Sequence, residues 1–101
     1  MRKDIIGICI YRHIKENCWS CGVTFGYVQN GKTVITGQVR EGIDIDIVTR
    51  KKPCFTYTQL KNFMSKKHGI ALPSKKDLIC NFSMNNIEVY AVKEYSCILY
   101  N

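Results

Sequence analysis

The segment from Thr56 to Gly69 carries start and stop signals for an α-helix, and it constrains the fold more than any other feature. Thr56 and Gln59 have the spacing of a capping box, in which each side chain bonds to the backbone N–H of the other residue. Gly69 can adopt the left-handed conformation that ends a helix. The apolar side chains between these signals recur at helical spacing and predict a buried stripe of Tyr57, Leu60, Phe63 and Met64. We therefore expect one main helix over about residues 56–68.

Strand patterns precede this helix. Ile5–Tyr11 is an apolar run typical of a buried strand. Asn30-Gly31 strongly favours a two-residue hairpin turn, and it predicts a register that opposes Val28 with Thr33 and Tyr27 with Val34. Ile43–Ile47 alternates apolar and acidic residues, which indicates a half-buried strand.

Strand patterns also follow the helix. A hairpin is expected to turn at Asn85-Asn86, with one face made of Cys80, Phe82, Met84, Ile87, Val89 and Ala91. A second reversal at Lys93-Glu94 would return Ser96–Tyr100 beside Ile87–Val92. The whole pattern predicts an α+β fold, an antiparallel sheet of about five to seven strands with the main helix packed on one face. At 101 residues, the chain is expected to form a single domain over residues 1–101.

Positive charge is concentrated around the predicted helix. Residues 47–76 hold eight Lys or Arg and no Asp or Glu, which gives a charge of +8. The other 71 residues hold seven Lys or Arg and eight Asp or Glu, which gives a charge of −1. The net charge of +7 therefore comes from one segment. A localised charge of one sign raises the local concentration of ligands of the opposite sign.

These cations form the candidate site. We predict that nucleic acid or another polyanion binds to Arg50, Lys51, Lys52, Lys61, Lys66, Lys67, Lys75 and Lys76. Phe55 and Tyr57 lie beside the first cations and could stack on unpaired bases, although Tyr57 also belongs to the predicted core stripe. A plainer interpretation is that the lysines only solubilise an exposed face.

The alternative is a small inhibitor or adaptor, of the kind that phages and mobile elements encode, which binds an acidic surface of a nucleic-acid-handling protein. Charge would then speed association, and a few aromatic anchors would supply the affinity, with Trp19 and Tyr11 the candidates if they are exposed. An unpaired sheet edge could also carry a homodimer.

Six cysteines are expected to be free thiols, mostly buried, because no secretory signal is recognised and a cytoplasmic location is therefore predicted. No membrane span is expected. Cys18 and Cys21 have the spacing of one half of a zinc knuckle, but no second pair accompanies them, and we expect a turn whose cysteines pack inward.

Catalytic residues and cofactors are not expected. Asp44 and Asp46 could hold a divalent cation in a nuclease, but their alternation with apolar residues favours an edge or solvent-facing strand whose polar side is acidic. Cys54 and His68 could form a nucleophilic pair, but they flank the helix at opposite ends. The sequence therefore favours a non-enzymatic binding protein.

Overall fold

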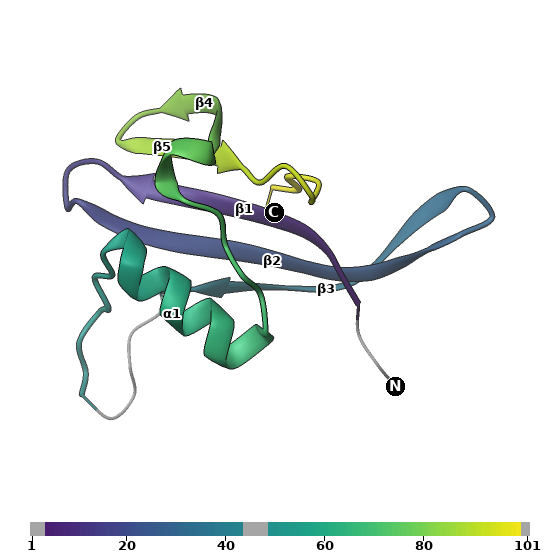
Figure 1. Cartoon of the computed structure of the whole chain (residues 1–101), viewed down its shortest axis with the longest axis horizontal. Coiled ribbons are helices and arrows are strands. Elements are labelled where there is room, and N and C mark those ends of the chain that lie inside the picture. The colour runs from purple at the N-terminus through teal and green to yellow at the C-terminus, as the bar shows by residue number, and fades with distance from the viewer. Residues whose placement is uncertain (1–3, 44–48, 100–101) are drawn as a thin grey trace.

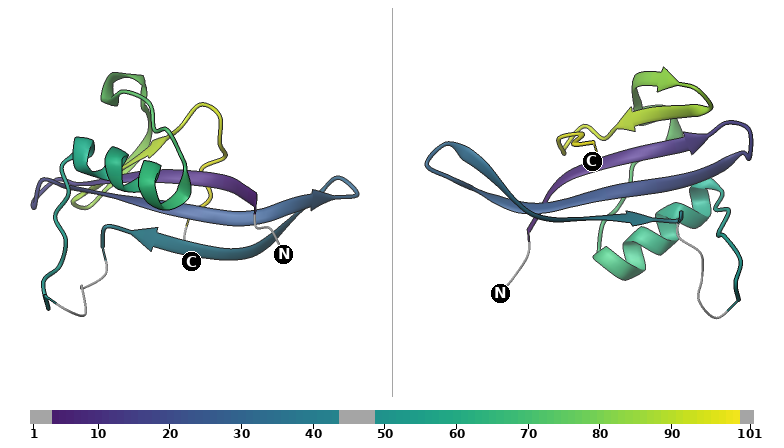
Figure 2. Two further views of the ribbon diagram at one scale, coloured as in Figure 1. Left: turned by 60° about the horizontal axis from the view of Figure 1, so that its bottom comes forward. Right: turned by 180° about the vertical axis from the view of Figure 1, so that it is seen from behind.

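The computed structural model describes residues 4–43 and 49–99 (Figure 1). Asp44 and Asp46, and with them the strand predicted over Ile43–Ile47 apart from its first residue, lie outside the described residues. The described chain forms a five-stranded antiparallel sheet in the order β3-β2-β1-β5-β4, with one main helix, α1, on one face (Figures 1 and 2). The predicted α+β class is confirmed.

Three strands build the first half of the sheet. They are β1 (Asp4–His13), β2 (Cys18–Gln29) and β3 (Lys32–Glu41). Asn30 and Gly31 turn the chain between β2 and β3, with positive φ angles of 53° and 74°. Most residues are strained at positive φ, whereas Asn and Gly adopt it readily. The predicted register is confirmed, with Val28 opposite Thr33.

Helix α1 spans Tyr57–His68 and begins and ends where the sequence predicts. The Gln59 N–H donates to the Thr56 hydroxyl at 3.2 Å, and the Thr56 N–H donates to the Gln59 side chain at 3.0 Å. Gly69, at φ 67°, ends the helix, and the Ile70 N–H donates to the Met64 carbonyl. No helix in residues 4–43 and 49–99 is long and apolar enough to cross a membrane.

The core lies between α1 and the sheet. Leu60 and Met64 are fully buried, and Tyr57 is 6% exposed. Their sheet partners are the inward side chains of β1 and β2, chiefly Ile8, Ile10, Trp19, Cys21 and Val23. The Trp19 and Tyr57 rings meet edge to face with centroids 5.0 Å apart. Burying each large apolar side chain stabilises the fold by roughly 1.5–3 kcal/mol, so this layer fixes the helix on the sheet.

A disulfide joins Cys18 to Cys54, so the expectation that all six cysteines are free is wrong. The segment before α1 runs beside the start of β2, where the Trp19 N–H donates to the Phe55 carbonyl at 2.9 Å. This pairing brings the two cysteine Cα atoms within 5.0 Å, although 36 residues separate them. The remaining cysteines are free thiols: Cys9 and Cys21 are buried, Cys97 is half-buried and Cys80 is exposed.

The Cys18–Cys21 segment is not the turn that its sequence suggested, because both residues lie within β2. Side chains alternate between the two faces of a strand, so residues three apart point to opposite faces. Cys18 and Cys21 therefore cannot bind one metal ion together in this conformation.

Strands β4 (Ile79–Met84) and β5 (Ile87–Ala91) form the second hairpin, and it turns at Asn85-Asn86 as predicted. One prediction within it is wrong. A register shift between Cys80 and Phe82 pairs Cys80 with Tyr90 and Phe82 with Val89. Cross-strand partners share a face, so Cys80 leaves the face that Phe82 and Val89 occupy.

The C-terminal segment reverses as expected but pairs with a different strand. Ser96 bridges Gly7 in a parallel sense, and its carbonyl accepts from the Ile8 N–H at 2.9 Å. Both edges of β5 are already occupied, by β1 and β4. The returning segment therefore lies beside the part of β1 that β5 does not reach.

Candidate polyanion interface

The eight predicted cations lie on three consecutive pieces of the chain. The segment before α1 carries Arg50, Lys51 and Lys52; α1 carries Lys61, Lys66 and Lys67; and the short 3-10 helix η1 (Lys75–Asp77) carries Lys75 and Lys76. Lys61 is half-buried and the other seven are exposed. Every one of them can therefore reach solvent to some extent.

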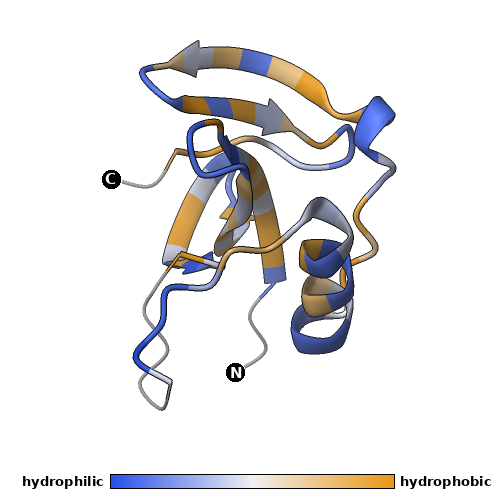
Figure 3. Ribbon diagram, turned by 90° about the vertical axis from the view of Figure 1, so that its left-hand side faces the viewer, coloured by the Kyte–Doolittle hydropathy of each residue, from blue (hydrophilic) through white to orange (hydrophobic). Residues whose placement is uncertain are grey.

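These cations do not share one surface. In Figure 3, residues 49–52 extend to the lower left, whereas α1 and η1 lie on the right. The left view of Figure 2 agrees, since that segment extends there below the sheet, whereas α1 and η1 lie above it. We therefore separate a loop group (Arg50, Lys51, Lys52) from a helix group (Lys61, Lys66, Lys75, Lys76).

Contacts through Trp19 place η1 beside the first turn of α1. The Lys75 Nζ lies 5.2 Å from the centre of the Trp19 ring, and that ring packs against Tyr57. Ammonium groups are attracted to aromatic faces at this distance. The Tyr57 hydroxyl also donates to the Pro73 carbonyl at 2.7 Å, which ties the segment leading to η1 to the helix. The helix group thus spans two neighbouring elements.

The lysines of α1 point in different directions. Successive helical residues are rotated by about 100°, so Lys61 and Lys67 flank the buried stripe on opposite sides and Lys66 points away from the core. The Lys67 flank faces the end of β3. Lys61 and Lys66 therefore remain on the side of the helix turned away from β3.

Lys67, also predicted to bind the polyanion, differs from the other seven cations in having a carboxylate partner. Its Nζ lies 2.8 Å from a carboxylate oxygen of Glu41, whose side chain is only 9% exposed. His68 Nε2 lies 2.9 Å from the same oxygen. Glu41 is the last residue of β3 and lies outside residues 47–76, so the charge count of that segment did not include it.

The other seven cations form no ion pair with a carboxylate within residues 4–43 and 49–99. Asp77 lies in η1 beside Lys75 and Lys76, and it lowers the net charge of η1 without pairing with either lysine in that part of the chain. Uncompensated cations of this kind produce a positive potential over their surroundings.

Tyr57 and Trp19 are not available for the contacts that the sequence allowed. Tyr57 is 6% exposed, and burial raises the pKa of its hydroxyl to about 12. Trp19 is 3% exposed and lies in the core, so it cannot serve as a surface anchor. Phe55 packs against Phe63, with ring centroids 5.4 Å apart, and is half-buried. The candidate interface therefore offers positive charge, whereas these three aromatic rings pack inside the protein.

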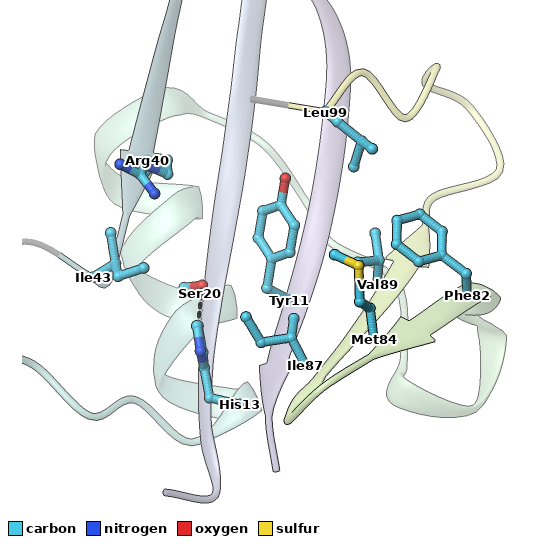
Figure 4. Close-up of a pocket in the computed structure, with 10 residues that line it drawn as sticks. All are labelled: Tyr11, His13, Ser20, Arg40, Ile43, Phe82, Met84, Ile87, Val89 and Leu99. Carbon is cyan, nitrogen blue, oxygen red and sulfur yellow. Dashed lines mark hydrogen bonds between the residues drawn. The ribbon is translucent and has the colours of Figure 1, made fainter. Parts of the chain in front are cut away.

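Sequence reasoning did not predict a pocket on the face of the sheet opposite α1, whose lining includes Tyr11, His13 and Ser20 (Figure 4). The i, i+2 spacing of Tyr11 and His13 indicates that they share a strand face. It does not indicate which other strands lie beside them. No protein-family model matches this chain, and neither a curated protein nor a solved structure matches it.

Proposed function

We propose that this chain is a non-enzymatic binding protein that binds nucleic acid, or another flexible polyanion, through the helix group, with the loop group as a second contact. One observation supports this most: seven cations of an acid-free segment lack a carboxylate partner within residues 4–43 and 49–99. A solubilising surface normally mixes both signs of charge.

Neutralising phosphates with lysine and arginine releases condensed counterions, so binding weakens as salt rises. Each phosphate contact contributes roughly 0.7 to the slope of log K against log salt for single strands and roughly 0.9 for duplex DNA. Because the loop group and the helix group face different sides, a flexible single strand can reach both, whereas a short rigid duplex contacts one (Figure 3). The proposal therefore favours single strands.

The test is an anisotropy titration of the purified chain with a labelled single strand of about 20 nucleotides and with the matching duplex, between about 50 and 200 mM salt. The expected result is salt-dependent binding that is steeper for the single strand. Replacing Arg50, Lys51 and Lys52 together by alanine should reduce the single-strand slope by about two units, since three phosphate contacts are lost. A slope that stays unchanged rejects the loop group.

An acidic protein partner is the second candidate, and the far end of the β2–β3 hairpin favours it. Among the described residues, the pairing of β1 with β2 ends at Asp4, which lies opposite Gly26. The β2–β3 hairpin continues beyond that pair to its turn (Figure 1). Tyr27, Val28 and Ile35 on this end are 44%, 68% and 50% exposed. A two-stranded ribbon with exposed apolar side chains suits burial against another protein. Absence of nucleic-acid binding, together with saturable binding to an acidic protein that Val28→Ser weakens, would favour this candidate.

A further inference from the structure

The C-terminal segment lies beside β1 and brings two free cysteines together (Figure 1). The Ile8 N–H donates to the Ser96 carbonyl at 2.9 Å. Two residues further along the segment, the Ile98 carbonyl accepts a hydrogen bond from the Cys9 thiol at 3.3 Å. Cys97 lies between these two contacts in the sequence, so its backbone runs alongside the part of β1 that holds Cys9.

The two thiols also interact with each other. Cys9 is 1% exposed, and burial raises the pKa of its thiol to about 12, with a hydrogen bond to the Cys97 side chain adding to the rise. Cys97 is half-buried, so a reagent in solution can reach it. Neighbouring strands lie roughly 4.8 Å apart, and a disulfide needs Cα atoms roughly 4.4–6.8 Å apart. The spacing between the C-terminal segment and β1 therefore suits a disulfide.

The other two free thiols are less well placed for such a bond. Cys21 pairs with Ile10, whose side chain packs against the helix. Cys9 precedes Ile10 on β1 and therefore faces the other side of the sheet. Cys80 lies on β4, and β5 separates β4 from β1. Among the free thiols that the structure describes, Cys9 and Cys97 are thus the pair best placed to react.

We infer that Cys9 and Cys97 form a second, reversible disulfide that fastens the C-terminal segment to β1 when a small disulfide such as oxidised glutathione is present. The more accessible Cys97 thiol loses its proton and attacks one sulfur of the small disulfide. The S–S bond of the small disulfide breaks, a mixed disulfide forms at Cys97, and one glutathione thiolate leaves.

Cys9 completes the exchange. Its thiol loses its proton and attacks the Cys97 sulfur, which releases the second glutathione thiolate. The two protons end on the released thiolates, so two protein thiols lose two electrons and one small disulfide gains them. Because the pKa of Cys9 is raised, its thiolate is scarce and this second step should be the slower one. The mixed disulfide at Cys97 should therefore appear before the protein disulfide.

The test treats the native wild-type chain with oxidised glutathione, blocks the remaining thiols, and identifies linked tryptic peptides by mass spectrometry. Cleavage after Lys and Arg places Cys9 in residues 4–12, Cys97 in residues 94–101 and Cys80 in residues 77–93. The expected product joins residues 4–12 to residues 94–101. If exposure alone decided the reaction, the exposed Cys80 would be linked to Cys97 in place of the buried Cys9.

Two controls connect this product to the fold. Oxidation in denaturant should spread the links of Cys97 over the other cysteines, because the native contacts are absent. In the folded protein, oxidation should raise the Tm of the wild type by at least about 5 °C, since nearly the whole chain lies between the two cysteines. The Tm of Cys97→Ser should stay unchanged under the same treatment.

Three results would overturn the inference: Cys97 linked mainly to Cys80, a mixed disulfide at Cys97 that never gives way to the protein disulfide, or the same pattern of links with and without denaturant. Failure of the chain to bind nucleic acid would leave the inference standing, since neither cysteine belongs to the loop group or the helix group.

Discussion

Lys67 and Glu41 form an ion pair of 2.8 Å between the last turn of α1 and the end of β3. The Glu41 side chain is 9% exposed and the Lys67 side chain is 54% exposed, so the pair joins a largely buried carboxylate to an exposed ammonium group. His68 lies on the same carboxylate oxygen at 2.9 Å. This contact joins the helix to an edge of the sheet, and it pairs one of the eight predicted polyanion-binding cations with a carboxylate.

Replacing Glu41 by glutamine should therefore have opposite effects on stability and on binding. The free energy of unfolding should fall by about 1–2 kcal/mol, since charged hydrogen bonds are lost from a buried group while the exposed Lys67 regains water. The released ammonium should steepen the salt slope for a single strand by about 0.7. Denaturant unfolding and salt-dependent titration measure the two effects. Glu94→Gln changes the net charge equally without freeing Lys67, and it should leave both quantities near the wild-type values.

Thr56→Ala should destabilise the protein by about 1 kcal/mol, because the first turn of α1 loses one half of its capping box. Thermal unfolding measures the change. Thr58→Ala is the matched control: Thr58 lies in the same turn, is exposed, and gains helix propensity on substitution. Equal destabilisation by both substitutions would contradict the assigned role of Thr56.

The Cys18–Cys54 disulfide should stabilise the folded state by up to about 4 kcal/mol, from the loop-closure entropy of a chain segment of this length. Adding reductant should lower the Tm of the wild type and should not change the Tm of Cys54→Ser, which lacks the disulfide. Cys80→Ser, which changes an exposed free thiol, should keep the wild-type response. Thiol titration of the unreduced, denatured chain should find four free cysteines; a result of six would show that the bond is absent.

His13 should titrate below the ordinary histidine pKa of 6.5, because burial lowers its pKa and the charge of Lys52 adds to the effect, while Glu16 opposes it. The unfolded chain then takes up the proton first, so stability should decrease as pH falls below about 6.5 until His13 is also protonated in the folded state. His13→Gln should show a smaller loss of Tm between pH 7.5 and 5.5. An NMR titration that places the His13 pKa at 6.5 or above would contradict this account.

The sequence predicted those elements that depend on near neighbours. The Asn30-Gly31 turn and the Thr56–Gln59 cap each need residues no more than three apart, and both occur as expected. The left-handed residue at Gly69 is equally local. The fold class follows from these elements because a single amphipathic helix must cover one face of the strands around it.

Features that depend on distant neighbours could not be predicted in this way. Cys54 meets Cys18 across 36 residues, and Lys67 meets Glu41 across 26. Neither pair can be predicted before the tertiary structure is known, because the disulfide needs the segment before α1 to lie beside β2 and the ion pair needs the helix to lie beside β3. The division of the cations into two groups has the same origin, since charge along the chain carries no information about sides of the molecule.

The most direct test of the proposed function replaces Lys61, Lys66 and Lys76 together by glutamine and measures log K against log salt for a single strand. The slope should decrease by about two units, because three phosphate contacts are removed. The control replaces Lys15, Lys32 and Lys93, which carry the same total charge outside the acid-free segment, and its slope should remain close to that of the wild type. Equal slopes for the two triple variants would contradict the claim that the helix group binds the polyanion.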